Sequence, residues 1–246
     1  MNKKYALILS LLITGLIANT IYLFSLLNEA NLESAVVERV IDGDTIVLQD
    51  GRQLRLANIN SPEKSSSLYP SSLREIKKLE NQTIQIEILG LDKYQRYLGR
   101  IYSPNYLNLE LVYTGMASKF LVDEKVLKEF SKAEKQAIEN QEGIWNHSIY
   151  YGCFSSEIDK NEEFLVITNN CQTINLKNWI LKDESRKTFV FPEIEAGEIT
   201  IHSEEGENTK EELFWNSKTN IWNNDRDSLY LFDEEGKIAH YDSYGY

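Results

Sequence analysis

The pattern of hydrophobic and polar positions divides the chain into three parts. An almost unbroken apolar run comes first, and a region that mixes strand-like with helical patterns follows. The last part contains short strand-like stretches without helical periodicity. We therefore predict an N-terminal membrane segment at residues 1–30, a first domain at 35–150 and a second domain at 155–246.

The apolar run extends from Tyr5 to Leu27, directly after Lys3 and Lys4. As a helix it spans roughly 35 Å, which is enough to cross a bilayer. It lacks both the polar face of a buried soluble helix and the small residues that precede the cleavage point of a signal peptide. We predict an uncleaved, single-pass transmembrane helix in the cell membrane. Both domains are then extracellular, because the lysines precede the span, and secretion is the alternative.

Residues 35–150 predict five strands and three helices. β-Branched and aliphatic stretches between Asp-Gly turn signals predict strands at Val36–Val40, Thr45–Leu48, Gln53–Leu56, Thr83–Leu89 and Tyr97–Tyr102. Helical spacing predicts helices from a capping box at Ser72 to just before Asn81, from Asn108 to Thr114, and from Asp123 to Gly143. This combination is typical of a small closed barrel with helices on its flanks.

Residues 155–246 predict an all-β domain. An acidic link at Ser155–Glu163 comes first. Seven short strands follow, at Phe164–Thr168, Thr173–Leu176, Trp179–Leu181, Thr188–Phe191, Glu198–His202, Leu229–Phe232 and Ile238–Tyr241. Their spacing is typical of an antiparallel sandwich. The whole chain is therefore expected to be mostly β.

Composition and charge exclude several classes of protein. With 42% hydrophobic and 26% charged residues, the chain is unlike a disordered or a polytopic membrane protein. Two cysteines, Cys153 and Cys171, exclude a disulfide-rich scaffold and argue against a structural zinc site; whether they pair stays open. Of the net charge of -12, residues 151–246 carry -11 and residues 31–150 carry -2. Nucleic acid is therefore compatible with the first domain and disfavoured by the second.

Acidic and basic side chains gather at the predicted corners of the first domain. Asp44 lies in an Asp-Gly-Asp-Thr turn, Arg55 in a strand, Glu63 at a Ser-Pro-Glu corner and Arg96 at the start of the last strand. Arginine binds phosphate through two parallel donors, and oxygen ligands suit a hard metal. A stiffly held carboxylate accepts a proton from an attacking water. These are the residue types that cleavage of a phosphodiester would require.

Taken in order, these motifs resemble the staphylococcal nuclease (thermonuclease) family. The resemblance covers residues 36–146 and includes Ile41–Thr45, Leu54–Leu56, Ser61–Glu63, Asp92–Arg96 and Gly143–Trp145. It implies an OB-fold barrel, a Ca2+ cofactor and cleavage of DNA or RNA. The residue roles that it implies are phosphate binding by Arg55 and Arg96, activation or orientation of water by Glu63, and metal binding by Asp44, Asn60 and the Ser61 carbonyl.

Two positions depart from the family pattern. Asn60 stands where the second calcium carboxylate is normally Asp, so we expect weaker calcium binding because one negative charge is lost. Gln95 stands where the family usually has Gly before the arginine, which restricts the backbone and bears on how Arg96 is presented.

The second domain resembles the lamin-tail domain, an immunoglobulin-like β-sandwich. The segments that carry the resemblance are Phe164–Asn170, Asn175–Leu181, Phe189–Pro192, Trp222–Asn224 and Leu229–Asp233. The resemblance implies attachment to a protein or surface partner that the sequence does not identify, with no chemistry of its own.

Three functions follow from these features. The first, which we predict, is a membrane-anchored extracellular calcium-dependent nuclease, a phosphodiesterase or endonuclease acting on DNA or RNA. The second is a catalytically impaired nuclease fold that serves as an extracellular binding or adhesion module, which Asn60 and the overall acidity favour. The third is a structural surface protein whose main role lies in the C-terminal sandwich.

Overall fold

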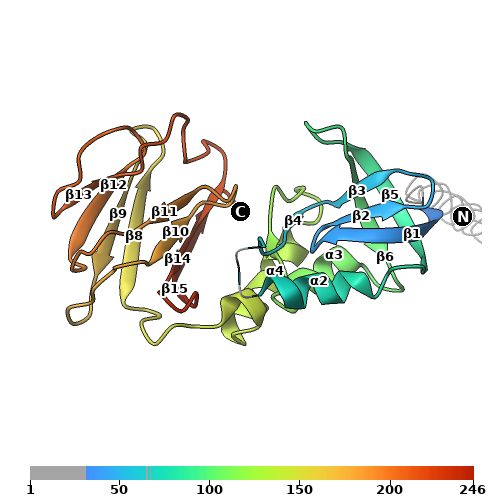
Figure 1. Ribbon diagram of the computed structural model, residues 1–246, viewed down its shortest axis with the longest axis horizontal. Helices are drawn as coiled ribbons and strands as arrows, with labels where there is room; N and C mark the ends of the chain where they lie inside the picture. Colours follow the sequence, from blue (N-terminus) through green and yellow to red (C-terminus); the bar gives the residue numbers. More distant parts are fainter. Residues whose placement is uncertain (1–31, 65, 67) are drawn as a thin grey trace, which may run out of the picture.

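The computed structural model of the chain describes residues 32–64, 66 and 68–246, which form two domains side by side (Figure 1). The membrane helix predicted within residues 1–30 lies outside this range. Among the helices that are described, none combines the length and the hydrophobicity that a bilayer crossing requires.

A closed five-stranded barrel forms the first domain, as the pattern of short strands predicts. Its strands are β1 (Leu32–Asp42), β2 (Thr45–Leu48), β3 (Gln53–Leu56), β5 (Thr83–Leu91) and β6 (Tyr97–Tyr102), in the order β1-β2-β3-β6-β5. Neighbouring strands are antiparallel except β3 and β6, which run parallel. Ile46, Leu54 and Ile86 fill the interior and have no exposed surface. Closure of the barrel leaves no free strand edge.

Three helices pack on the barrel and contribute Ile76, Leu111 and Phe130 to its core. They are α2 (Tyr69–Lys77), α3 (Leu107–Tyr113) and α4 (Leu127–Glu139); a 3-10 helix, η1 (Gly143–Trp145), follows. A short two-stranded sheet of β4 (Ile59–Asn60) and β7 (Ser118–Lys119) lies beside them.

The predicted capping box at Ser72 is wrong. The helix α2 begins at Tyr69 with Pro70 in its first turn, so Ser72 lies inside the helix. Proline favours this early start because its ring fixes φ in the helical region and its missing N–H is not needed there. The Ser72 hydroxyl instead donates to the carbonyl oxygen of Met116 at 2.8 Å, which ties α2 to the segment after α3.

The second domain consists of two four-stranded sheets with a core that includes Leu165, Trp179 and Leu231 between them. The sheet nearer the barrel contains β11 (Thr188–Val190), β10 (Ile180–Lys182), β14 (Asp227–Phe232) and β15 (Ile238–Tyr244) (Figure 1). The sheet on the far side contains β13 (Glu212–Phe214), β12 (Glu198–His202), β9 (Phe164–Asn169) and β8 (Phe154–Asp159).

Three details differ from the strands predicted for this domain. The predicted link Ser155–Glu163 begins within β8, an edge strand that pairs antiparallel with β9. An edge strand is held by main-chain hydrogen bonds to one neighbour and tolerates polar side chains. The serines and acidic residues of β8 therefore give no hydrophobic pattern from which a strand could be predicted. The strand β13 has no predicted counterpart, and the predicted strand at Thr173–Leu176 contains only an isolated bridge, between Asn175 and Glu195.

Cys153 and Cys171, whose pairing the sequence leaves open, form a disulfide with their Cα atoms 5.3 Å apart. The bond joins the residue before β8 to the turn after β9, so it staples the start of the second domain to its first hairpin.

A hydrophobic cluster joins the two domains. Trp145, in η1, packs against the rings of Tyr230 and Tyr241, with centroid distances of 5.9 and 4.8 Å. Ala137 and Ile238 belong to the same buried cluster. A buried apolar contact of this kind opposes relative motion of domains.

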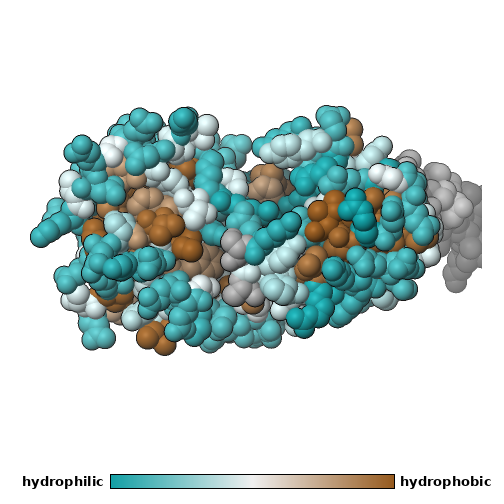
Figure 2. Space-filling view, in the orientation of Figure 1, coloured by the Kyte–Doolittle hydropathy of each residue, from teal (hydrophilic) through white to brown (hydrophobic). Residues whose placement is uncertain are grey.

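Figure 2 shows mainly hydrophilic side chains over one face of the molecule, with separate hydrophobic patches, in brown, on the two domains.

A buried polar network lies beside this cluster. The Lys119 ammonium, on β7, donates to the Tyr241 hydroxyl at 2.7 Å, and this hydroxyl donates to Glu134 Oε2 at 2.8 Å. Lys119 and Glu134 also form an ion pair, and both residues are buried. One side chain of the second domain therefore completes a charge pair of the first.

Candidate active site

Asp44 is buried in the turn between β1 and β2, and local contacts fix its carboxylate. Oδ2 accepts hydrogen bonds from the backbone N–H and the hydroxyl of Ser61, both at 2.9 Å, and Oδ1 accepts one from the Thr45 hydroxyl at 3.0 Å. Gly43 permits this close packing, because a Cβ there would lie 2.5 Å from the Ser72 hydroxyl oxygen.

Arg55 places a guanidinium beside this carboxylate. It lies in β3, directly across from Thr45 of β2, and its Nη2 is 3.3 Å from Asp44 Oδ2. Nη1 donates to the Leu56 carbonyl at 2.7 Å and Nη2 to the Ile59 carbonyl at 2.9 Å. The backbone around β3 and β4 therefore orients the guanidinium.

Asn60 and Ser61, at the end of β4, add further oxygen atoms to the site. Asn60 Oδ1 accepts from Arg55 Nη2 at 3.1 Å. Asn60 Nδ2 donates to the Glu184 carbonyl of the second domain at 2.9 Å, which fixes the orientation of the amide. The three predicted metal ligands, Asp44, Asn60 and Ser61, thus present oxygens to one point.

Arg186 occupies that point, and sequence reasoning missed it. It lies in the turn between β10 and β11, and its Nη2 donates to Asp44 Oδ2 at 3.0 Å, Asn60 Oδ1 at 2.5 Å and Ser61 O at 3.0 Å. No motif of the first domain points to it, because it lies 142 positions beyond Asp44. Its unusual feature, a left-handed backbone with φ of 76°, is visible only in the structure.

Arg96 lines the same cleft as Asp44, Arg55 and Asn60, which has a volume of about 710 Å³. Its Nε and Nη2 both lie 2.7 Å from Oδ2 of Asp92, in its own loop. The preceding Gln95 has φ of 64°, the left-handed conformation that glycine adopts most easily. The loop thus takes a glycine-like path although the side chain is larger.

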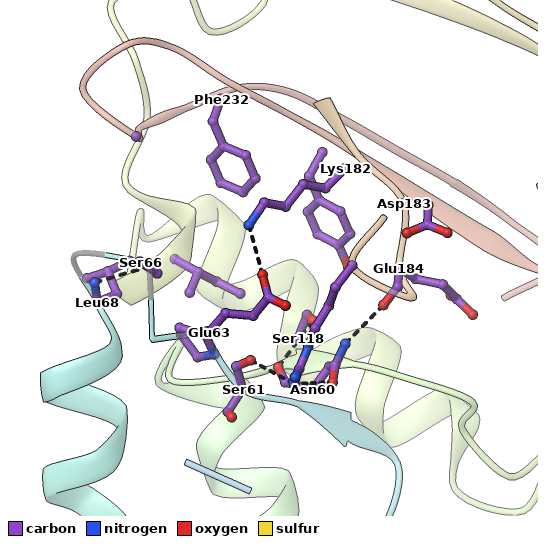
Figure 3. Close-up of a pocket in the computed structure, with 15 residues that line it drawn as sticks. Asn60, Ser61, Glu63, Ser66, Leu68, Ser118, Lys182, Asp183, Glu184 and Phe232 are labelled. Carbon is purple, nitrogen blue, oxygen red and sulfur yellow. Dashed lines mark hydrogen bonds and ion pairs between the residues drawn. The ribbon is translucent and has the colours of Figure 1, made fainter. Parts of the chain in front are cut away.

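Glu63 faces an adjoining, smaller pocket of about 100 Å³ (Figure 3). Its Oε2 lies 3.3 Å from the ammonium of Lys182, which belongs to β10 of the second domain. Asn60 and Arg186 line both this pocket and the larger cleft. Of the six predicted residues, Asp44, Arg55, Asn60 and Arg96 therefore line one cleft, whereas Ser61 and Glu63 line the pocket next to it.

Burial and ion pairing shift the pKa values at the site. Burial raises the pKa of Asp44, but the positive charges of Arg55 and Arg186 outweigh it and hold that pKa below its ordinary value. Burial also raises the pKa of Asp42, and the charge of Asp44 adds to this effect. Burial lowers the pKa of Arg55. Asp44 is therefore an anion at neutral pH and attracts cations.

The converging atoms suit a hard cation of the calcium type. Carboxylate, amide and carbonyl oxygens are calcium ligands, and here one of each lies within hydrogen-bond distance of a single positively charged group. No group of three His, Cys, Asp or Glu side chains able to hold a metal occurs among the described residues. The ligand set thus contains one carboxylate with neutral oxygens, which favours weak binding.

Comparison with known families assigns a match to each domain. The family described as staphylococcal nuclease homologue matches residues 53–147, and the lamin tail domain family matches residues 154–246. Both resemblances that the motifs indicated are therefore confirmed.

Several curated relatives match the first domain. A thermonuclease of Staphylococcus intermedius is 33% identical over 128 residues, which cover 46% of this chain and 76% of the relative. A thermonuclease of Staphylococcus hyicus is 31% identical over 136 residues, which cover 49% of this chain and 80% of that relative. A protein named uncharacterized endonuclease, from Escherichia coli O157:H7, is 37% identical over 84 residues, with 32% and 54% covered. The chain thus spans about half the length of that endonuclease.

Proposed function

Because the chain belongs to the staphylococcal nuclease homologue family, we propose that it is a calcium-dependent nuclease that hydrolyses phosphodiester bonds of DNA or RNA. The observation that carries this proposal is the cleft shared by Asp44, Arg55, Asn60 and Arg96. It combines oxygens that attract a cation with two guanidinium groups that attract a phosphate. The names of the relatives, thermonuclease and endonuclease, agree with this chemistry.

Asp44 Oδ2, Asn60 Oδ1 and the Ser61 carbonyl would hold the calcium ion. When bound there, calcium would polarise the phosphate and screen its negative charge. The contacts of Asp44 with Ser61 and Thr45 present the carboxylate without rearrangement. The neutral Asn60 lowers the charge of the ligand set, so the expected affinity is modest.

Arg55 and Arg96 would bind the phosphate. The backbone carbonyls that hold Arg55 set its planar fork in place, and a fork of this geometry matches two phosphate oxygens. Arg96 is paired with Asp92 in this structure, and its side chain is 27% exposed. A phosphate would therefore replace a carboxylate as the partner of Arg96.

Glu63 would accept the proton of the attacking water. Pro62 directly before it restricts the backbone, and a carboxylate positioned within reach of a water acts as a general base. In this structure Lys182 pairs with Glu63, so the carboxylate has to leave this partner before it accepts a proton.

Cleavage of single-stranded DNA, first with calcium and then with a chelator, tests the proposal. We expect chelation to abolish cleavage and Glu63→Gln to lower kcat roughly 10²-fold or more, because the base is lost while shape is kept. Glu75→Gln is the matched control, since Glu75 lies on α2 outside the cleft and pairs with Lys78, the residue after that helix. Cleavage that resists the chelator, or that is equal in Glu63→Gln and the wild type, contradicts the mechanism.

We also propose that residues 1–30 anchor the chain in a membrane with both domains outside the cell. The apolar run from Tyr5 to Leu27 and the Cys153–Cys171 disulfide support this location, because such bonds persist in oxidising compartments. The closed barrel supports an OB-type first domain, and the two facing sheets support an immunoglobulin-like second domain that binds a protein or surface partner. Digestion of intact cells by an added protease tests the location: both domains should be cut.

A catalytically impaired binding module is the second candidate, and Asn60 favours it. Asn60→Asp separates the two functions. In a working enzyme this change raises calcium affinity with little effect on the maximal rate, whereas in a lapsed enzyme activity appears where there was none. The variant also loses the Asn60 N–H donor to the Glu184 carbonyl, so its fold is checked by circular dichroism.

A further inference from the structure

One guanidinium nitrogen of the second domain contacts all three oxygens predicted to bind metal. Nη2 of Arg186 reaches Asp44 Oδ2 at 3.0 Å, Asn60 Oδ1 at 2.5 Å and the Ser61 carbonyl oxygen at 3.0 Å. These partners offer lone pairs only, and the nitrogen is part of a delocalised positive charge. The position of a bound cation is therefore taken by a cation from the same chain.

The backbone that delivers Arg186 is strained. Its φ of 76° lies in the left-handed region, which is unfavourable for a residue with a Cβ. The turn is held by Asp183, whose carboxylate accepts from the backbone N–H of Lys187 at 2.6 Å and from the Ser185 hydroxyl at 2.5 Å. The hairpin's own hydrogen bonds also define this turn, since the Arg186 N–H donates to the Asp183 carbonyl at 3.3 Å and the Asp183 N–H donates to the Lys187 carbonyl at 3.2 Å.

The same hairpin also pairs with the predicted base. Lys182, the last residue of β10, has its ammonium 3.3 Å from the Glu63 carboxylate. Lys182 and Arg186, four positions apart, therefore contact both halves of the site. Arg186 also borders both the cleft and the pocket of Glu63. The hairpin thus lies where metal and water would have to enter.

We propose that the β10–β11 hairpin is an autoinhibitory cap, in which Arg186 occupies the cation position of the metal-free chain and calcium binds only by displacing it. This inference rests on the proposed nuclease function for its biological meaning. A guanidinium and a divalent cation cannot share the same three oxygens, because like charges repel at this separation. Binding of calcium is then an exchange of one cation for another.

Displacement requires movement of one side chain and its turn, not of the whole domain. The Arg186 side chain is 33% exposed, so it has open solvent to move into. The domains stay joined through the Trp145 cluster and the network of Lys119, Glu134 and Tyr241, which do not include the turn. The cap therefore opens while the interface remains closed.

Isothermal titration of calcium chloride into the full-length chain in detergent, without nucleic acid, tests the cap. Arg186→Gly removes the guanidinium and places at φ of 76° the residue that prefers it, so we expect a folded protein with a calcium Kd lower by about tenfold or more. Arg186→Asn, which also tolerates a left-handed backbone, should give the same shift. An unchanged or weaker affinity in both variants overturns the proposal.

Arg226→Ala is the matched control. Arg226 also joins the domains, through a bond of 2.7 Å to the Val122 carbonyl, but it does not touch the cation position. The calcium affinity of Arg226→Ala should equal that of the wild type. A gain in affinity as large as that of Arg186→Gly overturns the proposal, because loosening of the domain interface then explains the gain in both variants.

Cleavage assays separate the cap from the nuclease function itself. At low calcium, Arg186→Gly should cut faster than the wild type, and at saturating calcium the two rates should be equal. A fall of tenfold or more at saturation assigns Arg186 to the reaction and overturns the cap. Absence of cleavage in all variants refutes the proposed function, while the calcium titration still decides whether Arg186 competes for the site.

Discussion

Arg55 is held mainly by main-chain oxygens rather than by acids. Two carbonyls accept its hydrogen bonds, and its side chain is 10% exposed, so its fork has one orientation before any ligand binds. An electrostatic group placed in advance stabilises developing charge without reorganisation, which is the largest single contribution in many enzymes.

At this scale, Arg55→Lys is expected to lower kcat roughly 10²-fold, because a lysine offers a point charge instead of two parallel donors. It also leaves the Leu56 and Ile59 carbonyls short of donors, so the free energy of unfolding should fall by about 1–3 kcal/mol. Steady-state kinetics and urea unfolding measure the two effects. Arg52→Lys, which pairs with Asp50 outside the cleft, should change neither, and equal losses in both variants contradict the role of Arg55.

Sequence patterns predict the residues of the barrel at this site but not Arg186. Asp44, Arg55 and Arg96 lie in short motifs whose order along the chain indicates that they meet. Arg186 lies in a turn of a different domain, where local composition resembles any charged hairpin. A contact between domains depends on how two folded surfaces dock, and no local pattern encodes that.

At the scale of elements, Asp183 organises the β10–β11 turn from a buried position. It is 2% exposed and accepts hydrogen bonds from Ser185 and Lys187. Burial raises its pKa to about 6 in spite of the Ser185 hydrogen bond, and the negative charge of Asp227 adds to the rise while Lys187 opposes it. The turn that carries Arg186 therefore depends on a carboxyl group that resists ionisation.

This shift predicts a pH dependence of stability. Below about pH 4 Asp183 is protonated in both the folded and the unfolded chain. Between about pH 4 and 6 the unfolded chain loses this proton while the folded chain keeps it. The contribution of Asp183 to the free energy of unfolding therefore falls as the pH rises. Urea unfolding of wild type and Asp183→Asn across pH 4 to 7 measures it. From pH 4 to pH 7 the free energy of unfolding of the wild type should fall by up to about 3 kcal/mol relative to that of Asp183→Asn.

Asp225→Asn is the control for that series, because Asp225 is exposed. Its unfolding free energy should follow that of the wild type at every pH. Parallel curves for wild type and Asp183→Asn would show that Asp183 titrates normally and does not shape the turn in the way described.

Element boundaries show where sequence reasoning stops. The five barrel strands are predicted because each is rich in β-branched or aliphatic residues. The strand β8 is not predicted, because most of its side chains are polar and its main-chain hydrogen bonds to β9 hold it in the sheet. Pro70 outweighs Ser72 in fixing the start of α2, since a proline that fits the first turn moves the helix start upstream.

At the scale of the whole molecule, Tyr241 couples the two domains through a buried charge pair. Tyr241→Phe removes a hydroxyl that accepts from Lys119 and donates to Glu134, with the ring contact to Trp145 kept. We expect the free energy of unfolding to fall by about 1–3 kcal/mol because a buried acceptor and a buried donor lose a partner. Urea unfolding followed by tryptophan fluorescence measures this loss.

Tyr244→Phe is the matched variant for this comparison. Its hydroxyl donates to the Asn223 carbonyl within the second domain, so the coupling between domains is untouched. We expect Tyr241→Phe to separate the unfolding of the two domains into distinct steps and Tyr244→Phe to leave their relation as in the wild type. Identical behaviour of both variants would mean that the polar network contributes nothing to coupling.

The first strand of the barrel starts at the pole of the molecule remote from the lamin tail domain (Figure 1). A tether joined to Leu32 would therefore hold the barrel next to the lipid and leave the β13 end of the molecule outermost. A strand of nucleic acid would then reach the barrel from the side, between the bilayer and the lamin tail domain. A larger surface would contact the lamin tail domain before it contacts the barrel. With the anchor proposed for residues 1–30, the end of the barrel at which β1 begins would decide which of the two domains lies farther from the membrane.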